Sequence, residues 1–383
     1  MKLKKLRVLE VMTHFDLGGA ESVAISLGEA LSDRIDFAFL SVFEGGETAI
    51  GRSMRARLDA RGIAQHHGTR IGFKRGGLVP AGVRLARLVD AVRPDVVHLH
   101  TELPEAAWSV ASLVSRRVRQ TPLLRTIHNT RLWPSWRAFG LWSERRLQAG
   151  RVVAVSEGAL AAVQNLREQA GLPRLDQARA SIVLNGVSVP SGVHRGSDPH
   201  GPSRVLFAGR LEAQKGADLL PQIWSSAKAT ATRPMRLTVL GEGTLKAELT
   251  AAFAGDRSVE FLPPVPALSR ALLNYDVLLV PSRFEGLPLV AVEALMAGLS
   301  VVAFDAPGLR EVFPTGYPLL VPEGDVAAFA QIVSSVLGGA TEGVAVAAAS
   351  VRARFSIDRM AEDYARLFQD VALTGESVER RAS

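Results

Sequence analysis

The chain has 383 residues, of which 47% are hydrophobic and 22% charged, and this is enough material for two globular domains with separate cores. It contains no cysteine, so disulfides and thiolate chemistry are excluded, and no uninterrupted apolar stretch reaches the ~18 residues of a membrane-spanning helix. The formal charge of +7 is uneven, because residues 1–190 hold 27 Lys and Arg against 17 Asp and Glu, whereas residues 191–383 hold 18 against 21. The basic first half favours an anionic partner, such as nucleic acid, an anionic membrane surface or a phosphate-bearing substrate.

The first predicted strand covers residues 6–12 and leads into a helix through a loop with two adjacent glycines, Gly18 and Gly19. Glycines at such a turn let the backbone come close to a ligand, and the following helix offers free N–H groups to an anion. The loop does not match the dinucleotide-binding fingerprint Gly-x-Gly-x-x-Gly.

A glycine-rich basic loop at residues 70–77 follows two further strands of the first half. It carries Arg70, Lys74 and Arg75, whose charge and setting make it a candidate substrate-binding segment.

Histidines mark the ends of two predicted strands. In the strand at residues 94–100, His98 and His100 stand at positions i and i+2 and therefore on one face. That geometry permits metal binding, but no third ligand is evident and a structural pairing is favoured. His128 ends the strand at residues 123–128, where its side chain is expected to enter the same crevice as the two-glycine loop.

Tryptophan and arginine alternate in the stretch that follows. Trp133, Trp136 and Trp142 are interleaved with arginines from Arg131 onwards. This composition fits a helix at a membrane interface, and it fits equally a core helix with an ordinary arginine face.

The second half restarts a sheet at residues 205–208, followed by a loop with Arg210 and Lys215 just before a helix. Two fixed cations beside a helix N-terminus suit a diphosphate, which gains charge as it departs. A further strand and turn at residues 237–243 contain Gly241, where backbone contact to a ligand is expected.

A buried strand at residues 277–280 leads into the most informative stretch of the chain. Glu285 lies in the strand-to-helix loop, and Glu293 lies inside the following helix. Because such loops line the ligand crevice of open α/β sheets, the two carboxylates could hold two hydroxyl-rich parts of one ligand.

This stretch resembles the signature of the retaining family 4 glycosyltransferases with the GT-B architecture. The resemblance rests on two glutamates with seven residues between them, set in Pro281-Ser282-Arg283-Phe284-Glu285-Gly286-Leu287-Pro288 and followed by Glu293-Ala294-Leu295-Met296-Ala297-Gly298.

The resemblance implies a role for each candidate residue. Glu285 would contact the donor sugar, Glu293 the ribose, Arg210 and Lys215 the diphosphate, and His128 the surroundings of the reacting carbon. His128, Arg210, Lys215 and Glu285 are then the catalytic candidates. Further donor contacts are expected from Gly18, Gly19, Gly241, Gly286 and Leu287, and acceptor contacts from Arg70, Lys74, Arg75 and Arg131.

The expected fold is α/β, with two doubly wound Rossmann-like domains facing a central cleft. Residues 1–190 would form the acceptor-binding domain, onto which a C-terminal helix at residues 355–371 packs back. A linker rich in Pro, Gly and Ser at residues 189–203 would lead to the nucleotide-sugar-binding domain at residues 203–354.

The expected activity is retaining transfer of a sugar from a UDP- or GDP-sugar to a hydroxyl of a glycan or lipid-linked acceptor, in cell-envelope polysaccharide or glycolipid synthesis. The resemblance implies that the departing phosphate takes the acceptor proton, and neither a metal nor a cofactor is expected.

Two alternatives stay open: a sugar-nucleotide epimerase or phosphorylase of the same architecture and, more distantly, a non-catalytic anion or nucleic-acid binder. No nucleic-acid-binding motif occurs, so we expect no nucleic-acid partner. We expect a cytoplasmic protein, with peripheral contact to an anionic membrane as a separate hypothesis.

Overall fold

The computed structural model describes residues 5–16, 18–45, 48–188, 201–266, 268–339 and 343–382, with the backbone alone from residue 375. The chain divides into two compact units. Unit 1 comprises Met1–Gly186 with Ile357–Ser383, and unit 2 comprises Val187–Ser356. The predicted linker, up to residue 200, lies outside the described residues.

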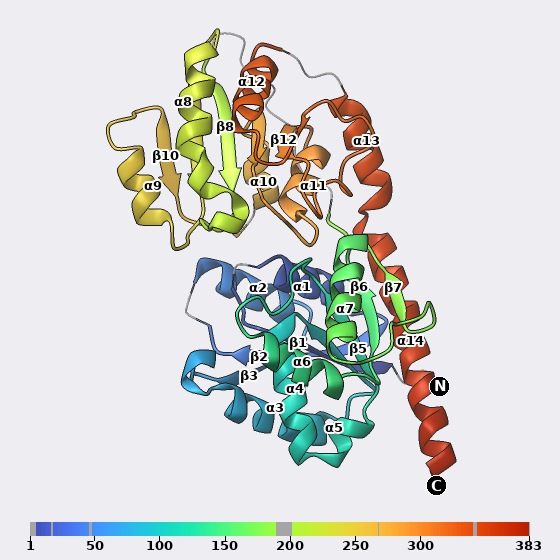
Figure 1. Ribbon diagram of the computed structural model, residues 1–383. Coiled ribbons are helices and arrows are strands. Elements are labelled where there is room, and N and C mark those ends of the chain that lie inside the picture. Colours follow the sequence, from blue (N-terminus) through green and yellow to red (C-terminus); the bar gives the residue numbers. More distant parts are fainter. Residues whose placement is uncertain are drawn as a thin grey trace. The chain divides into compact units, whose positions relative to one another are not determined.

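Unit 1 is built on a sheet whose described strands all run parallel, in the order β3-β2-β1-β4-β5-β6-β7 (Figure 1). Every residue of the inner strand β4 is buried, as expected for a parallel sheet that is covered on both faces. The strands are β1 Leu6–Met12, β2 Ile35–Phe43, β3 Ala64–Thr69, β4 Val96–His100, β5 Leu123–Ile127, β6 Arg151–Ala154 and β7 Ala180–Ile182.

The helices of unit 1 begin where the sequence supplies caps. Thr48, Ser115 and Ser156 each accept a hydrogen bond from a backbone N–H in the first turn of α2, α5 and α7. The C-terminal helix α14 also belongs to unit 1, where Tyr364 and Phe368 are fully buried. The helices are α1 Gly19–Leu31, α2 Ala49–Asp59, the 3-10 turn η1 Phe73–Arg75, α3 Leu78–Val92, α4 Glu102–Val114, α5 Arg116–Gln120, α6 Arg137–Arg146, α7 Glu157–Gln169 and α14 Ile357–Ala382.

Unit 2 repeats this plan with a parallel sheet in the order β10-β9-β8-β11-β12-β13. Its strands are β8 Ser203–Ala208, β9 Met235–Leu240, β10 Val259–Leu262, β11 Val277–Val280, β12 Ser300–Phe304 and β13 Leu320–Val321. Its helices are the 3-10 turns η2 Ala213–Lys215 and η3 Ala217–Leu219, α8 Leu220–Thr230, α9 Lys246–Ala252, α10 Leu268–Leu272, α11 Leu289–Met296, α12 Val326–Leu337 and α13 Val344–Arg354.

Both sheets place the first strand of the unit beside its fourth, β1 beside β4 and β8 beside β11. The strand order reverses at this point, and ligands of open α/β sheets bind there, outside the carboxyl ends of the strands. The predicted α/β class with two Rossmann-like domains is confirmed, and the loops after β1, β4, β5, β8 and β11 are where a site is to be sought.

Candidate functional site

Two loops of unit 2 bring a lysine and a glutamate together at the carboxyl ends of β8 and β11. Lys215 places Nζ 2.7 Å from both carboxylate oxygens of Glu285. The hydroxyl of Ser282 donates a further hydrogen bond to Glu285 Oε1 at 2.7 Å. Glu285 is buried and Lys215 half-buried, so salt and water screen this pair less than an exposed one. The structure thus joins two residues that the sequence predicted separately.

Arg210 lies on the same loop as Lys215, with an exposed side chain. Its Nη2 donates to Oε1 of Gln214 at 2.8 Å. Gln214 in turn donates from Nε2 to the carbonyl of Phe284 at 3.2 Å, and its own carbonyl accepts from the N–H of Arg283 at 2.9 Å. Gln214 therefore links the loop after β8 to the loop after β11. This role could not be predicted from the sequence, because a glutamine in a polar loop carries no signal of its own.

Glycines explain how closely these loops pack. Gly216 has φ +66°, and a Cβ on it would lie 1.9 Å from the carbonyl oxygen of Pro281. A Cβ on Gly241 would lie 1.9 Å from the carbonyl oxygen of Gly209. A side chain at either position would force the loops apart. Packing alone accounts for Gly241, and its contact with a nucleotide stays a prediction.

The chain continues from Glu285 through Gly286 and Leu287, both buried, into α11, which carries Glu293. Glu293 is half-buried, and burial raises the pKa of its carboxyl group to about 7. No residue in the described part of the chain hydrogen-bonds to this carboxyl group. Glu293 can therefore accept hydrogen bonds from a ligand without first giving up a protein partner, whereas Glu285 is already paired.

In unit 1 the two-glycine loop leads directly into α1, with Gly18 at its N-cap. A Cβ on Gly18 would lie 1.9 Å from Oε2 of the buried Glu21, so the glycine makes room for this carboxylate. A negative side chain near a helix N-terminus is favourable. It also competes with the anion that the sequence places at Gly18 and Gly19, and that contact stays a prediction.

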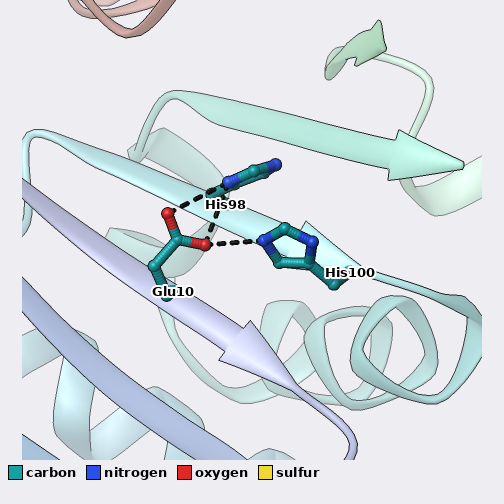
Figure 2. Close-up of side chains that lie close together, drawn as sticks. All are labelled: Glu10, His98 and His100. Carbon is teal, nitrogen blue, oxygen red and sulfur yellow. Dashed lines mark hydrogen bonds and ion pairs between the residues drawn. The ribbon is translucent and has the colours of Figure 1, made fainter. Parts of the chain in front are cut away.

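His128 follows β5 and joins a buried network in unit 1. Its Nε2 lies 3.0 Å from Nδ1 of His100. Nε2 of His100 lies 2.7 Å from Oε2 of Glu10, and Nδ1 of His98 lies 3.1 Å from Oε1 of the same carboxylate (Figure 2). On the other side of His98, Nε2 lies 2.7 Å from the hydroxyl of Thr126.

The environment of the network fixes its charge. Burial opposes ionisation of Glu10, but His98 and the hydrogen bonds from His100 and His98 outweigh it and lower its pKa to about 2. Burial and the neighbouring His98 lower the pKa of His100 to about 4. Burial and the same two histidines hold the pKa of His128 well below its ordinary value. At neutral pH Glu10 is therefore ionised, whereas His100 and His128 are neutral.

Glu10 is the third partner that the sequence analysis did not find for His98 and His100. The only signal was a lone acid within the apolar strand at residues 6–12, which had to pair inside the core. The ligand atoms of these three residues lie within 4.8 Å of one another, close enough to hold a metal ion. Their contacts of 2.7–3.1 Å are nevertheless shorter than the roughly 3.3 Å expected between two ligands of a tetrahedral zinc. The expected structural pairing describes the cluster better than a metal centre does.

The predicted acceptor loop of unit 1 presents its charge to solvent. Lys74 and Arg75 are exposed on η1. Arg70 donates from Nε and Nη2 to the carboxylate of Glu44 at 2.7 and 3.1 Å. The loop thus offers charged groups to a ligand, and acceptor binding by these residues stays a prediction.

The tryptophan and arginine segment is partly buried and partly exposed. Trp133 is buried in the core of unit 1, whereas Trp136 is 50% exposed. Trp136 packs edge-on against Phe73 with ring centroids 5.1 Å apart, so the segment that carries the exposed Arg131 lies beside η1. Within the described residues no helix has the length and apolar character needed to cross a membrane.

One model of a protein family matches each half of the chain. The family model described as "Glycosyltransferase Family 4" matches residues 17–189, and the one described as "Glycosyl transferases group 1" matches residues 202–338.

Individual relatives cover most of the chain. The 2-deoxystreptamine glucosyltransferase of Streptomyces kanamyceticus is 30% identical over 302 residues, which are 70% of this chain and 74% of that protein. The glycogen synthase of Mycobacterium tuberculosis is 28% identical over 306 residues, 75% of this chain and 70% of that protein. Among solved structures, Anabaena HepE in complex with UDP-glucose has a TM-score of 0.76 at 18% identity, covering 95% of this chain and 100% of its own. This likeness shows the same fold.

Proposed function

Because the chain belongs to family 4 of the glycosyltransferases with the GT-B architecture, we propose that it moves a sugar from a nucleoside diphosphate sugar to a hydroxyl of an acceptor with retention of the anomeric configuration. The contact between Lys215 and Glu285 carries the proposal. It sets a cation for the phosphates and a carboxylate for the sugar side by side at the switch point of unit 2.

The donor is proposed to be a UDP- or GDP-sugar. UDP has the stronger support, because Anabaena HepE of the same fold is described in complex with UDP and with UDP-glucose. Glu293 would accept hydrogen bonds from the ribose, consistent with its half-buried carboxyl group, which has no hydrogen-bond partner among the described residues. Gly241, Gly286 and Leu287 would line the donor site.

Donor binding would rearrange the charges of unit 2. In the free protein Glu285 neutralises Lys215. A diphosphate carries more charge than one carboxylate, so it would attract Lys215 and the exposed Arg210 together. Glu285 would then be released to accept hydrogen bonds from the sugar.

In the transfer itself the bond from the anomeric carbon to the diphosphate oxygen breaks, and a bond to the acceptor oxygen forms on the same face of the sugar. The acceptor proton passes to the departing diphosphate. Arg210 and Lys215 would stabilise the charge that develops on this leaving group. We propose no metal or cofactor, because these two cations can supply the neutralisation.

We propose that unit 1 receives a glycan or lipid-linked acceptor at the surface formed by η1 and the segment beside it. Its exposed large apolar side chains stand among basic residues, a combination that suits the anionic face of a membrane. Failure to bind anionic liposomes at low salt would refute the membrane contact. The exposed apolar residues are Ile71, Val79 and Trp136.

The donor is tested by thermal stabilisation with a panel of UDP-, GDP-, ADP- and CMP-sugars. A ligand that binds only the folded protein raises the melting temperature by mass action. We expect one nucleotide to stabilise the protein and the Lys215→Met variant to lose most of that stabilisation. Lys228→Met is the matched control, because Lys228 also pairs with a carboxylate of unit 2, Asp256, at 2.9 Å on an exposed surface.

Turnover with the selected donor then separates the alternatives. Product that appears only with an acceptor hydroxyl supports transfer, whereas epimerisation or phosphorolysis without such an acceptor would favour the other enzymes of this architecture. No stabilisation by any member of the panel, or equal losses in Lys215→Met and Lys228→Met, would refute the proposed donor site.

A further inference from the structure

The proposed donor site depends on the loop after β8, residues 209–216, because this loop carries both Arg210 and Lys215. Loops are in general more mobile than the strands that they follow. Two cations stabilise one diphosphate best when they are held in place before the ligand arrives. Contacts with the neighbouring loops of unit 2 are therefore required to hold this loop.

On one side the loop is held by the turn after β9. The carboxylate of Glu212 accepts hydrogen bonds from the backbone N–H of Thr244 at 2.9 Å and from its hydroxyl at 2.7 Å. These bonds lower the pKa of Glu212, which keeps the carboxylate an acceptor at neutral pH. The backbone N–H of Leu211 donates in addition to the carbonyl of Glu242 at 2.8 Å. The loop is thus anchored to β9 by side chain and backbone.

On the other side the loop and the segment after β11 hold each other. The carbonyl of Gln214 accepts from the backbone N–H of Arg283 at 2.9 Å. The guanidinium of Arg283 then reaches back, donating to both carboxylate oxygens of Asp218 at 2.7 Å and to the carbonyl of Ala213. Gln214 and Arg283 therefore meet where the two loops cross, next to the contact between Lys215 and Glu285.

The side chain of Gln214 lies between a group that can only donate and a group that can only accept. Its Oε1 accepts from Nη2 of Arg210 at 2.8 Å, and its Nε2 donates to the carbonyl of Phe284 at 3.2 Å. An amide serves both partners, whereas an ionised carboxylate lacks the donor and an ammonium group lacks the acceptor. The amide is also neutral, so it orients Arg210 without neutralising the charge that an anionic ligand would meet.

We infer that Gln214 is a positioning residue of the donor site, which holds the guanidinium of Arg210 and links its loop to the loop that carries Glu285. The part that concerns the donor rests on the proposed function, whereas the link between the loops does not. Among the described residues the exposed guanidinium of Arg210 has no hydrogen-bond partner other than Gln214. Without this amide the arginine would have to lose its rotamer freedom when the donor binds.

The link is tested first in the unliganded protein, by amide hydrogen exchange measured with NMR. The backbone N–H of Arg283 is the reporter, because it donates to the carbonyl of Gln214. Gln214→Met keeps this carbonyl and the length of the side chain but removes both side-chain bonds. We expect the amide of Arg283 to exchange roughly fivefold faster, the factor for one lost hydrogen bond.

Gln331→Met is the matched control, because Gln331 is an exposed glutamine on α12 of the same unit. We expect it to leave the exchange of Arg283 unchanged. Unchanged exchange in Gln214→Met, or the same acceleration in both variants, would overturn the inference whether or not the protein has transferase activity.

Gln214→Glu separates the two ends of the amide. The carboxylate can still accept from Arg210, but it cannot donate to the carbonyl of Phe284. We expect the amide of Arg283 to exchange as fast as in Gln214→Met. Exchange at the wild-type rate would contradict the link through Nε2.

The effect on Arg210 is tested by a double-mutant cycle, with titration calorimetry of the nucleotide sugar that stabilises the wild type most. We expect Gln214→Met to weaken binding roughly fivefold, and to weaken it less in the Arg210→Met background, where the amide has no guanidinium to hold. Equal losses in the two backgrounds would show that Gln214 does not act through Arg210. Absence of binding by every nucleotide sugar would refute the proposed donor site instead, while the exchange of Arg283 would still decide the link between the loops.

Discussion

The two units of the molecule share a frame and differ in where they keep their charges. In each unit the first strand carries an arginine that is joined to an aspartate just before the fourth strand. Arg7 hydrogen-bonds Asp95 from its backbone N–H at 2.8 Å and from Nη2 at 2.9 Å. Arg204 does the same to Asp276 at 2.7 and 2.8 Å. In both units, therefore, an arginine–aspartate pair joins the first strand to the amino end of the fourth strand. We call each of these pairs a clamp.

The cores around these clamps differ. Among the described residues, unit 1 buries many charged or histidine side chains, whereas in unit 2 Glu285 is the one of this kind that is buried. The buried charged and histidine residues of unit 1 are Glu10, Glu21, His98, His100, Glu105, Arg125, Glu144 and Arg167. Unit 2 instead holds Arg210, Lys215 and Arg283 in loops at the carboxyl edge of its sheet. The difference teaches that one frame can serve two purposes: unit 1 has a rigid polar interior, and unit 2 has charges that an anionic ligand can reach.

A quartet of charged side chains makes up half of these buried residues of unit 1. Arg125 of β5 donates to Glu105 of α4 at 2.8 Å and to both oxygens of Glu144 of α6 at 2.6 and 3.1 Å. Arg167 of α7 donates to Glu144 at 3.0 Å. Burial opposes ionisation of Glu144, but the two arginines outweigh it and lower its pKa. The quartet connects three helices to the sheet, although burial still raises the pKa of Glu105 to about 7.

The largest effect is expected from breaking this quartet. Arg125→Met leaves the carboxylates of Glu105 and Glu144 buried with less compensation, a change that typically costs about 3–5 kcal/mol. We expect the free energy of opening of unit 1 to fall by that amount, as measured by native-state hydrogen exchange of peptides from β5 and α4.

The matched control lies in unit 2. Arg283 pairs with Asp218 at 2.7 Å, but both side chains are about one-third exposed. We expect Arg283→Met to cost less than about 1 kcal/mol, because water replaces the lost partner. Equal losses in the two variants would show that burial of charge does not distinguish the units.

The sequence predicts those features that depend on local patterns. The apolar runs at residues 6–12 and 277–280 are strands, and the stretch after the second run carries Glu285 in a loop and Glu293 on a helix, as expected. The position of Arg210 and Lys215 in the loop after the strand at residues 205–208 was predicted in the same way. Each of these inferences needs only neighbours along the chain.

The features that could not be predicted from the sequence depend on strands that are adjacent in space but far apart in sequence. Glu10 meets His98 and His100 only because β4 lies beside β1, 88 and 90 residues away along the chain. Nothing in the spacing of these residues reveals that pairing. The orientation of Trp133 into the core and of Trp136 towards solvent likewise depends on how α6 packs, and composition alone left both arrangements open.

The two clamps offer a finer test of the shared frame. The side chain of Asp276 is 8% exposed and that of Asp95 31% exposed. Arg204→Ala should therefore lower the free energy of opening of unit 2 by about 2 kcal/mol, the range for hydrogen bonds to a charged group. Arg7→Ala should cost unit 1 about 1 kcal/mol, since Asp95 is better solvated. Hydrogen exchange of peptides from β8 and β1 measures both.

Arg310→Ala is the control for the variants Arg204→Ala and Arg7→Ala, because Arg310 is 73% exposed and pairs with Asp305 on the surface. We expect almost no change. A larger loss in Arg7→Ala than in Arg204→Ala would mean that burial of the aspartate does not set the strength of the clamp.

A further prediction concerns the carboxyl group of Glu293, to which no described residue hydrogen-bonds. Burial raises the pKa of Glu293 to about 7, so its carboxyl group is largely protonated at pH 6 and ionised at pH 8. If the ionised form accepts hydrogen bonds from the ribose, binding of a UDP-sugar should be roughly tenfold weaker at pH 6 than at pH 8, or about 1.4 kcal/mol. Titration calorimetry over this range measures the change. A UDP-sugar is the proper probe, because free UDP has a terminal phosphate that titrates in the same range, at about pH 6.

Glu293→Gln separates this effect from other titrations. The amide is neutral at every pH, so the affinity of the variant should stay level between pH 6 and 8. The free variant should also be more stable than the wild type at pH 8: a carboxyl group whose pKa rises on folding loses stability as the pH rises from its unfolded pKa towards its folded one. A wild-type affinity that is independent of pH, or a variant that keeps the full dependence, would show that the ionised carboxylate of Glu293 is not what binds the nucleotide. The charges at the loops of unit 2 would then act on the diphosphate alone.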